Sequence, residues 1–210
     1  MKVNKLNYNE LTCKSMSFGE IMNQTYHVGP DIVQKMLPFL HHTTLKRDQL
    51  LIPEGARNNN MYVILEGLVR SYFYNGERED TLWFATSGDW FCSMRSYLHN
   101  CPAVSNIEAL TETRLAYIRH EDLEQLFSES VELANWGRII AFEELDALEW
   151  RHSQLTGGDA FSRYKAFLRM RPAEIICQIP QKYIASYLGI TPSTLSRIRL
   201  KLLKEDASSE

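Results

Sequence analysis

The segment from Pro180 to Leu203 constrains the fold of this chain more than any other part of it. Two short apolar runs at helical spacing meet at Gly189, and the second helix is predicted to begin at Thr191-Pro192. Threonine caps a helix through its hydroxyl, and proline is tolerated at the first helical position because the N–H that it lacks would have no partner there. Two helices this short, joined by a glycine that permits a left-handed backbone, predict a helix-turn-helix. The apolar positions are Ile184, Ala185 and Leu188 in the first helix, and Ile190, Leu195, Ile198 and Leu202 in the second.

The polar face of the second predicted helix carries positive charge and no negative charge. Its hydroxyl and cationic side chains are Ser193, Thr194, Ser196, Arg197, Arg199, Lys201 and Lys204. A solvated surface helix usually mixes both signs, so this face is typical of one that meets phosphates and base edges. An ordinary helical hairpin with a basic rim is the alternative that the pattern leaves open.

Charge is distributed unevenly along the chain. The net charge is −3, yet residues 159–204 contain nine Lys or Arg against two Asp or Glu, whereas residues 1–158 contain 14 against 21. An acidic body with a basic C-terminal module is the asymmetry expected of a DNA-binding regulator. The 44% hydrophobic and 23% charged residues are typical of a globular protein with one large or two small domains.

The sequence carries no signal for a membrane, a secretory leader or a metal. No stretch approaches transmembrane length and no apolar region follows the N-terminal lysines, so we expect a cytoplasmic protein without a membrane partner. The four cysteines, Cys13, Cys92, Cys101 and Cys177, include no C-x-x-C pair. We expect buried or idle thiols, rather than the disulfides or zinc that scattered cysteines also allow, and we predict no bound cofactor or metal.

Residues 43–118 are predicted to be β-structure. Short β-favouring runs are separated by turn signals, with glycines at positions 55, 67, 76 and 88, and Asn75-Gly76 is a strong hairpin signal. Many short strands at this spacing predict a β-sandwich or a jelly-roll-like, double-stranded β-roll. The predicted strands are Leu50–Ile52, Met61–Leu65, Val69–Tyr74, Thr81–Ala85, Ser105–Leu110 and Arg114–Ile118.

A long helix is predicted to follow the β-region. After a short helix over Glu121–Phe127, the segment Glu129–Leu155 has no proline and one glycine. Its apolar residues form two adjacent stripes, so we expect one stripe to cover the β-roll and the other to meet a second copy of the chain. We assign the dimer contact to Trp136, Ile140 and Ala147. Packing on one side only is the alternative.

The predicted long helix ends at a glycine pair. Gly157-Gly158 is expected to act as a hinge, and Asp159 is placed to cap the next helix, Ala160–Arg169. The expected fold is therefore α+β. It has an N-terminal arm with a short helix (residues 1–38, the helix over Asp31–Leu37), a β-roll (39–128), a coupling and dimerisation helix (129–156), a helix-turn-helix domain (159–204) and an acidic tail (205–210).

This order of parts resembles the Crp/Fnr family of transcription regulators over nearly the whole chain. The residues that carry the resemblance are Pro53-Glu54-Gly55, the run from Tyr62 to Gly67, Gly88-Asp89-Trp90 and the run from Ile184 to Ile198. The resemblance implies a β-roll of the cyclic-nucleotide-binding type, a dimerisation helix, and DNA recognition by the second helix of the motif.

Two departures from the family pattern affect the expected function. Members that bind cyclic AMP have a ribose-binding glutamate where this chain has Ser93, and a phosphate-binding arginine followed by a small hydroxyl residue where it has Ala103 and Val104. A buried phosphate without a cationic or amide cradle is strongly disfavoured, so we expect no cyclic AMP binding in the family manner. The β-hairpin wing that many members carry after the recognition helix is also expected to be absent. The candidate effector pocket comprises Cys92, Ser93, Met94, Arg95, Ala103 and Val104.

The family pattern also suggests where DNA is contacted. Its base-reading positions fall on Pro192, Ser193 and Arg197, and Arg197 suits bidentate contact with guanine. The candidates for phosphate contact are Lys182, Thr191, Thr194, Arg199 and Lys201. The expected partners are double-stranded DNA with an inverted-repeat site, a second copy of the chain, RNA polymerase and an unknown small-molecule effector.

Two other classes of function stay open. Metal-dependent cupin enzymes also have small β-rolls, but they need His-x-His with a further Glu and His. Here His41 and His42 are adjacent, are expected to precede the sheet, and point in opposite directions if extended. No nucleophile–base set is apparent, so an enzyme is not expected. The other alternative is a ligand-binding or interaction module of this fold without DNA binding, against which the basic C-terminal segment argues.

Overall fold

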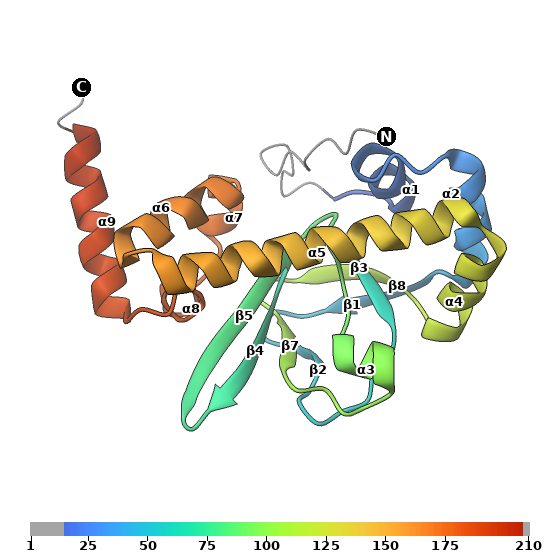
Figure 1. Ribbon diagram of the computed structural model, residues 1–210, viewed down its shortest axis with the longest axis horizontal. Coiled ribbons are helices and arrows are strands. Elements are labelled where there is room, and N and C mark those ends of the chain that lie inside the picture. Colours follow the sequence, from blue (N-terminus) through green and yellow to red (C-terminus); the bar gives the residue numbers. More distant parts are fainter. Residues whose placement is uncertain (1–14, 208–210) are drawn as a thin grey trace.

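One long helix connects two bodies in the computed structural model, which describes residues 15–207 (Figure 1). Helix α5 (Val131–Gly157) runs along the long axis, with the β-strands and the N-terminal helices along one part and helices α6 to α9 at its far end. The α+β expectation is confirmed. Residues 1–14 of the predicted arm, Cys13 within them, and the side chains of the predicted acidic tail lie outside the described residues.

Two antiparallel sheets form the predicted β-roll. One sheet has the strand order β1-β8-β3-β6 and the other β2-β7-β4-β5. All six predicted strands are confirmed, and β1 and β6 are additional. Strand β1 was not predicted because its sequence is mostly polar and lacks the apolar alternation of a strand. The strands are β1 (His41–Leu45), β2 (Leu50–Ile52), β3 (Met61–Glu66), β4 (Leu68–Asn75), β5 (Arg78–Thr86), β6 (Trp90–Phe91), β7 (Asn106–Ala109) and β8 (Thr113–Ile118).

Aromatic side chains fill much of the space between the two sheets. Tyr62 stacks on Phe91 with ring centroids 5.4 Å apart and lies 5.4 Å from Tyr117, while Trp83 lies 5.6 Å from Phe91. Ala103 is 3% exposed within the same core. The interior of the roll around Ala103 is thus packed with apolar and aromatic side chains.

The N-terminal helices cover the outer face of the first sheet. They are α1 (Phe18–Glu20), the π-helical turn η2 (Ile21–Thr25), α2 (Pro30–Met36) and the 3-10 turn η3 (Leu37–Phe39). Phe18 meets Trp90 edge-on at 6.0 Å, and Ile21 and Met22 are fully buried. Residues 18–25 of the predicted arm are therefore helical and place Phe18, Ile21 and Met22 in the core; each turn is too short to show a helical period in the sequence.

Helix α5 packs its first stripe against this core. It follows α4 (His120–Glu129) and is capped by Ser130, whose hydroxyl accepts a hydrogen bond from the Leu133 N–H, so the predicted start at Glu129 is two residues early. Trp136 is 5% exposed and lies 4.9 Å from Trp90. The assignment of Trp136 to a dimer contact is therefore wrong, because its own β-roll and N-terminal helices bury it. Ile140 packs partly against the same cluster, and Ala147 is half-buried.

The C-terminal body consists of short helices that follow the predicted break. Asp159 caps α6 by accepting a hydrogen bond of 2.7 Å from the Ser162 N–H, as predicted, and Gly158 lies in extended conformation between α5 and this cap. The helices of this body are α6 (Ala160–Met170), α7 (Ala173–Ile176), α8 (Gln181–Tyr187) and α9 (Pro192–Ala207).

Candidate nucleic-acid interface

Helices α8 and α9 form the predicted helix-turn-helix. Gly189 lies in the turn with a φ of +64°, a left-handed conformation that side chains rarely adopt. The Thr191 hydroxyl accepts a hydrogen bond of 3.2 Å from the Thr194 N–H, and Pro192 is the first residue of α9. Leu195 is fully buried against the rest of the body. The local start and turn signals thus act as the sequence predicted.

The predicted base-reading residues lie on an open side of α9. This helix forms the end of the molecule, with α8 on its inner side (Figure 1). Pro192, Ser193 and Arg197 are all exposed. The Arg197 Nε–H donates to the Ser193 carbonyl at 3.4 Å and Nη2 donates to the Thr194 hydroxyl at 3.4 Å. Both bonds are long, so the guanidinium exchanges them for a ligand at little cost.

The predicted phosphate-contacting residues flank this side. Lys182, Thr191, Arg199 and Lys201 are exposed, and Thr194 is half-buried. The Lys201 ammonium lies 4.5 Å from the ring centroid of Phe161, and that of Lys182 lies 4.6 Å from Tyr183. Each ammonium therefore lies over an aromatic ring, in a cation–π contact near the surface. Their contacts with phosphates stay predictions.

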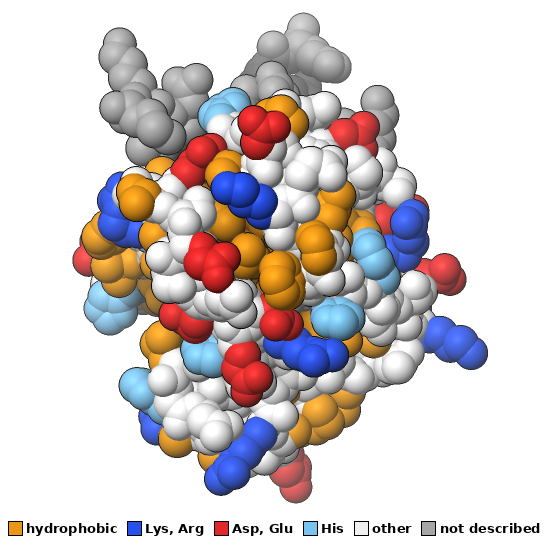
Figure 2. Space-filling view, turned by 90° about the vertical axis from the view of Figure 1, so that its right-hand side faces the viewer, with side chains coloured by type: hydrophobic (Ala, Val, Ile, Leu, Met, Phe, Trp, Pro, Cys, Tyr) orange, Lys and Arg blue, Asp and Glu red, His pale blue; other side chains and the backbone are white. Residues whose placement is uncertain are grey.

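The opposite end of the molecule has a different charge pattern. Figure 2 views the end away from α9, where acidic and basic side chains are interspersed among polar and apolar ones. By contrast, the exposed cations of α9, Arg197, Arg199, Lys201 and Lys204, follow one another along a single helix. Residues 192–204 of α9 thus carry cations and no carboxylate, unlike the mixed surface at the other end.

Two further residues share the exposed side of α9. Ser196 is exposed, and Leu200 is 59% exposed. They follow Ser193 by three and seven residues, so both fall on its side of the helix together with Arg197. Sequence reasoning placed Ser196 on the polar face without assigning it a DNA contact, and it missed Leu200, although helical periodicity applied to Ser193 would have found both.

A second exposed surface runs along α5. Phe142, Leu145 and Leu148 are 58%, 51% and 56% exposed, and they recur at spacings of three residues. Leu145 and Leu148 belong to the predicted stripe of positions 134, 141, 145, 148 and 155, whereas Phe142 falls in neither predicted stripe. Exposed apolar side chains that recur along one side of a helix are typical of an interaction surface. The outward stripe is therefore the one without Trp136, which reverses the assignment made from the sequence.

Arg70 on β4 joins the β-roll to helix α8. Its side chain is 1% exposed and forms ion pairs with Glu79 and Glu108. Its guanidinium carbon lies 3.4 Å from the ring centroid of Tyr183 on α8 and 3.9 Å from that of Tyr72. One buried cation is thus shared between strands of the roll and the first helix of the helix-turn-helix.

Hydrogen bonds reinforce the same contact. The Ser186 hydroxyl on α8 donates to the Glu79 carbonyl and accepts from the Thr81 N–H, both at 2.8 Å. Arg171, between α6 and α7, forms an ion pair of 2.9 Å with Asp89. The helix-turn-helix body is therefore held against the β4–β5 hairpin by directional bonds as well as by apolar packing.

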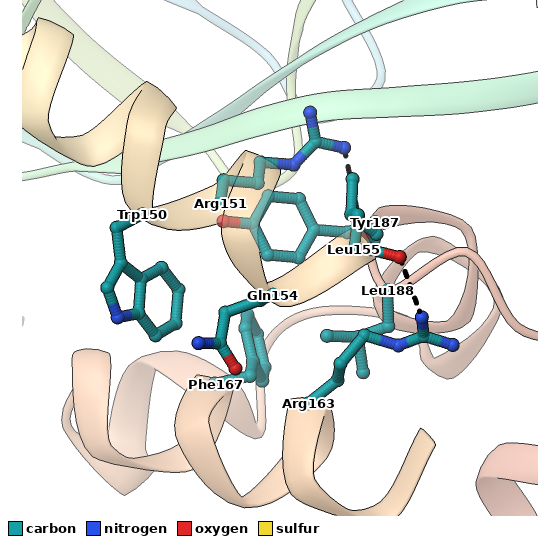
Figure 3. Close-up of a pocket in the computed structure, with 8 residues that line it drawn as sticks. All are labelled: Trp150, Arg151, Gln154, Leu155, Arg163, Phe167, Tyr187 and Leu188. Carbon is teal, nitrogen blue, oxygen red and sulfur yellow. Dashed lines mark hydrogen bonds between the residues drawn. The ribbon is translucent and has the colours of Figure 1, made fainter. Parts of the chain in front are cut away.

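The end of α5 closes the junction between the two bodies, as Figure 3 shows. Nη2 of Arg151 donates to the Thr81 carbonyl at 3.0 Å and to the Tyr187 carbonyl at 3.3 Å, and Nη1 of Arg163 donates to the Leu155 carbonyl at 3.3 Å. The small pocket at this junction has a volume of about 10 Å³, roughly the space of one water molecule. It is lined by Trp150, Arg151, Gln154, Leu155, Arg163, Phe167, Tyr187 and Leu188.

The residues of the predicted effector pocket differ in their surroundings. Cys92 packs against the core beneath α5, and burial raises the pKa of its thiol to about 12, whereas Ala103 packs inside the roll. Ser93 is buried just before α3 (Met94–His99). The remaining members are exposed: Met94, Arg95 and Val104.

An open cleft of about 220 Å³ lies apart from these residues. It is lined by Glu66, Gly67, Leu68, Thr86, Thr111, Glu112, Ile175 and Gln178.

The histidines considered for a metal site lie within the first sheet. His41 and His42 are the first residues of β1 and pair with Tyr117 and Ala116, so the expectation that they precede the sheet is wrong. His41 stacks on Tyr117 with centroids 5.0 Å apart. Within residues 15–207, no group of three His, Cys, Asp or Glu residues is placed to hold a metal ion.

Comparison with known proteins gives the fold a name. Residues 42–130 match the family model of the cyclic nucleotide-binding domain. FixK2 from Bradyrhizobium japonicum superimposes with a TM-score of 0.69 at 23% identity, covering 80% of this chain and 86% of FixK2. This chain has the Crp/Fnr fold. CooA from Carboxydothermus hydrogenoformans (TM-score 0.68, 17% identity, 92% of this chain and 87% of CooA) shares it.

The Crp/Fnr fold is also that of CLP from Xanthomonas campestris, described as a c-di-GMP-responsive global regulator. CLP superimposes with a TM-score of 0.69 at 18% identity, covering 85% of this chain and 93% of CLP. No curated protein sequence matches this chain significantly. In the part of the chain that the structure describes, none of the helices combines the length and apolarity needed to cross a bilayer. The cytoplasmic location stays a prediction.

Proposed function

We propose that this protein is a transcription regulator that binds double-stranded DNA through α9. One observation carries the proposal: the second helix of a helix-turn-helix presents Ser193 and Arg197 at an open surface and has cations along its length. A recognition helix enters the major groove with its N-terminal residues at the base edges, while flanking cations meet phosphates. The fold shared with FixK2, CooA and CLP supports the same function.

The proposed DNA-binding form is a homodimer. The outward stripe of α5, represented by Phe142, Leu145 and Leu148, is long and apolar enough for a paired helix from a second copy. A two-fold dimer presents two copies of α9, so its site is an inverted repeat with half-site centres about 34 Å, or one helical turn of DNA, apart.

The contact between the two bodies supports regulation through the position of α9. Arg70, Ser186 and Arg171 join residues of the β-roll to residues of the helix-turn-helix body. A ligand or protein that favours another arrangement of the roll must change these contacts, and it thereby shifts the population of DNA-competent molecules. RNA polymerase and a small-molecule effector, the other partners expected from the sequence, stay predictions.

Selection of bound sequences from random duplex DNA tests the function. We expect enrichment of an inverted repeat, and binding that weakens steeply with salt because phosphate contacts release counterions. The double variant Arg197→Ala/Lys201→Ala is the matched control, since both side chains are exposed and their loss leaves the core intact. Absence of any enriched sequence with the unmodified protein would overturn the proposal.

A further inference from the structure

Leu200 occupies the middle of the exposed side of α9. It is 59% exposed, and Arg197, Arg199, Lys201 and Lys204 surround it in the sequence. The buried side of the same helix is formed by Leu195 and Ile198. Leu200 is thus not part of the apolar face that packs the helix-turn-helix; it lies on the side proposed to face DNA.

Ser193, Ser196, Arg197 and Leu200 form a continuous ridge along this side. Their spacing of i, i+3, i+4 and i+7 places them in one row on an α-helix. The recognition helix of homeodomains contacts the major groove through residues at this same spacing. Ser193 and Ser196 are small, so no bulky side chain in the first half of the row keeps the helix from approaching the floor of the groove.

We infer that Leu200 is a specificity-determining residue that contacts the 5-methyl group of a thymine. This inference rests on the DNA-binding function proposed above, and it adds one contact, that of Leu200 with a thymine. Thymine is the base that presents an apolar group in the major groove, and apolar side chains recognise it there. Leu200 lies about 10 Å along the helix axis from Ser193, so it reads a base roughly three pairs farther along the groove.

Deleting single thymine methyl groups from DNA tests the inference. In the enriched site, each thymine is replaced in turn by deoxyuridine, which removes the methyl group and keeps the pairing edge. For the unmodified protein we expect one such replacement per half-site to weaken binding about fourfold, the effect of exposing one buried methyl. The Leu200→Ala variant is expected to bind the thymine-containing site more weakly than the unmodified protein does. The same replacement is expected to leave the affinity of this variant unchanged.

Leu203→Ala is the matched control. Leu203 is 66% exposed on the same helix and lies almost one turn farther from the base-reading N-terminal end, so this variant is expected to keep the full sensitivity to the methyl group. If Leu200→Ala keeps that sensitivity, or if no thymine of the site shows it, the inference is overturned while DNA binding stands. Failure of the unmodified protein to enrich any site would instead overturn the proposed function.

Discussion

The guanidinium carbon of Arg70 lies 3.4 Å from the ring centroid of Tyr183. This contact joins a strand of the β-roll to the first helix of the helix-turn-helix, while Glu79 and Glu108 neutralise the same cation from the roll. Because the arginine is buried, its loss leaves carboxylates without their counter-charge and removes the surface on which Tyr183 rests. Arg70 therefore links the stability of the roll to the placement of α9.

Arg70→Ala is expected to lower the free energy of unfolding by about 3–5 kcal/mol, the usual effect of removing one partner of a buried ion pair. Denaturant unfolding measures it. Arg78→Ala is the control on the same hairpin: Arg78 pairs with Asp80, but its side chain is 72% exposed, so we expect a loss below about 1 kcal/mol. Similar losses for the two variants would show that Arg70 has no special structural role.

Arg197→Ala is expected to weaken binding to the enriched site by roughly 1–3 kcal/mol and to relax the preference at one base position. The reason is the loss of a bidentate donor that recognises guanine. Equilibrium binding to the site and to single-base variants of it provides the measurement. A loss that is equal on all sequences would place Arg197 on a phosphate.

Lys201→Ala is expected to weaken binding to all duplexes about equally and to reduce the slope of log affinity against log salt by about one unit. Its ammonium beside Phe161 lies at the edge of the exposed side, where a phosphate contact carries no sequence information. Titrations at several salt concentrations on specific and random duplexes measure both effects. A selective loss on the enriched site would reverse the role assigned to this lysine.

Leu145→Asp is expected to convert the dimer to a monomer and to abolish tight binding to the inverted repeat, because it introduces a charge into the apolar stripe of α5. Analytical ultracentrifugation gives the oligomeric state. Leu50→Asp is the control: Leu50 is a comparably exposed leucine on β2, 42% against 51%, outside that stripe. A monomeric unmodified protein, or dimers of both variants, would contradict this interface.

Cyclic AMP at millimolar concentration is expected to leave the melting temperature unchanged. Ala103, the residue that the family resemblance predicts at the position of the phosphate-binding arginine, is uncharged and is packed into the interior of the roll. A ligand that binds only the folded state must stabilise it once its concentration exceeds the dissociation constant. A saturable rise in melting temperature with cyclic AMP would therefore refute the expectation.

The apolar stripes of α5 were predicted from the sequence, but the direction that each stripe faces was not. Periodicity correctly indicated two apolar faces on one helix, but it could not say which face meets the β-roll. Trp136 was assigned outward and Leu145 was not, whereas the structure buries Trp136 beside Trp90 and exposes Leu145. The choice depends on the N-terminal helices, whose short turns left no periodic signal.

The sequence by itself determined the elements whose signals are local: the helix start at Thr191, the turn at Gly189, the cap at Asp159 and most strands of the roll. Each depends on the conformational preference of one residue and its immediate neighbours. Only the tertiary structure decided the inward face of α5 and the burial of Arg70 against Tyr183. Such contacts join residues that are distant in the sequence, and their energies exist only once the chain has brought them together.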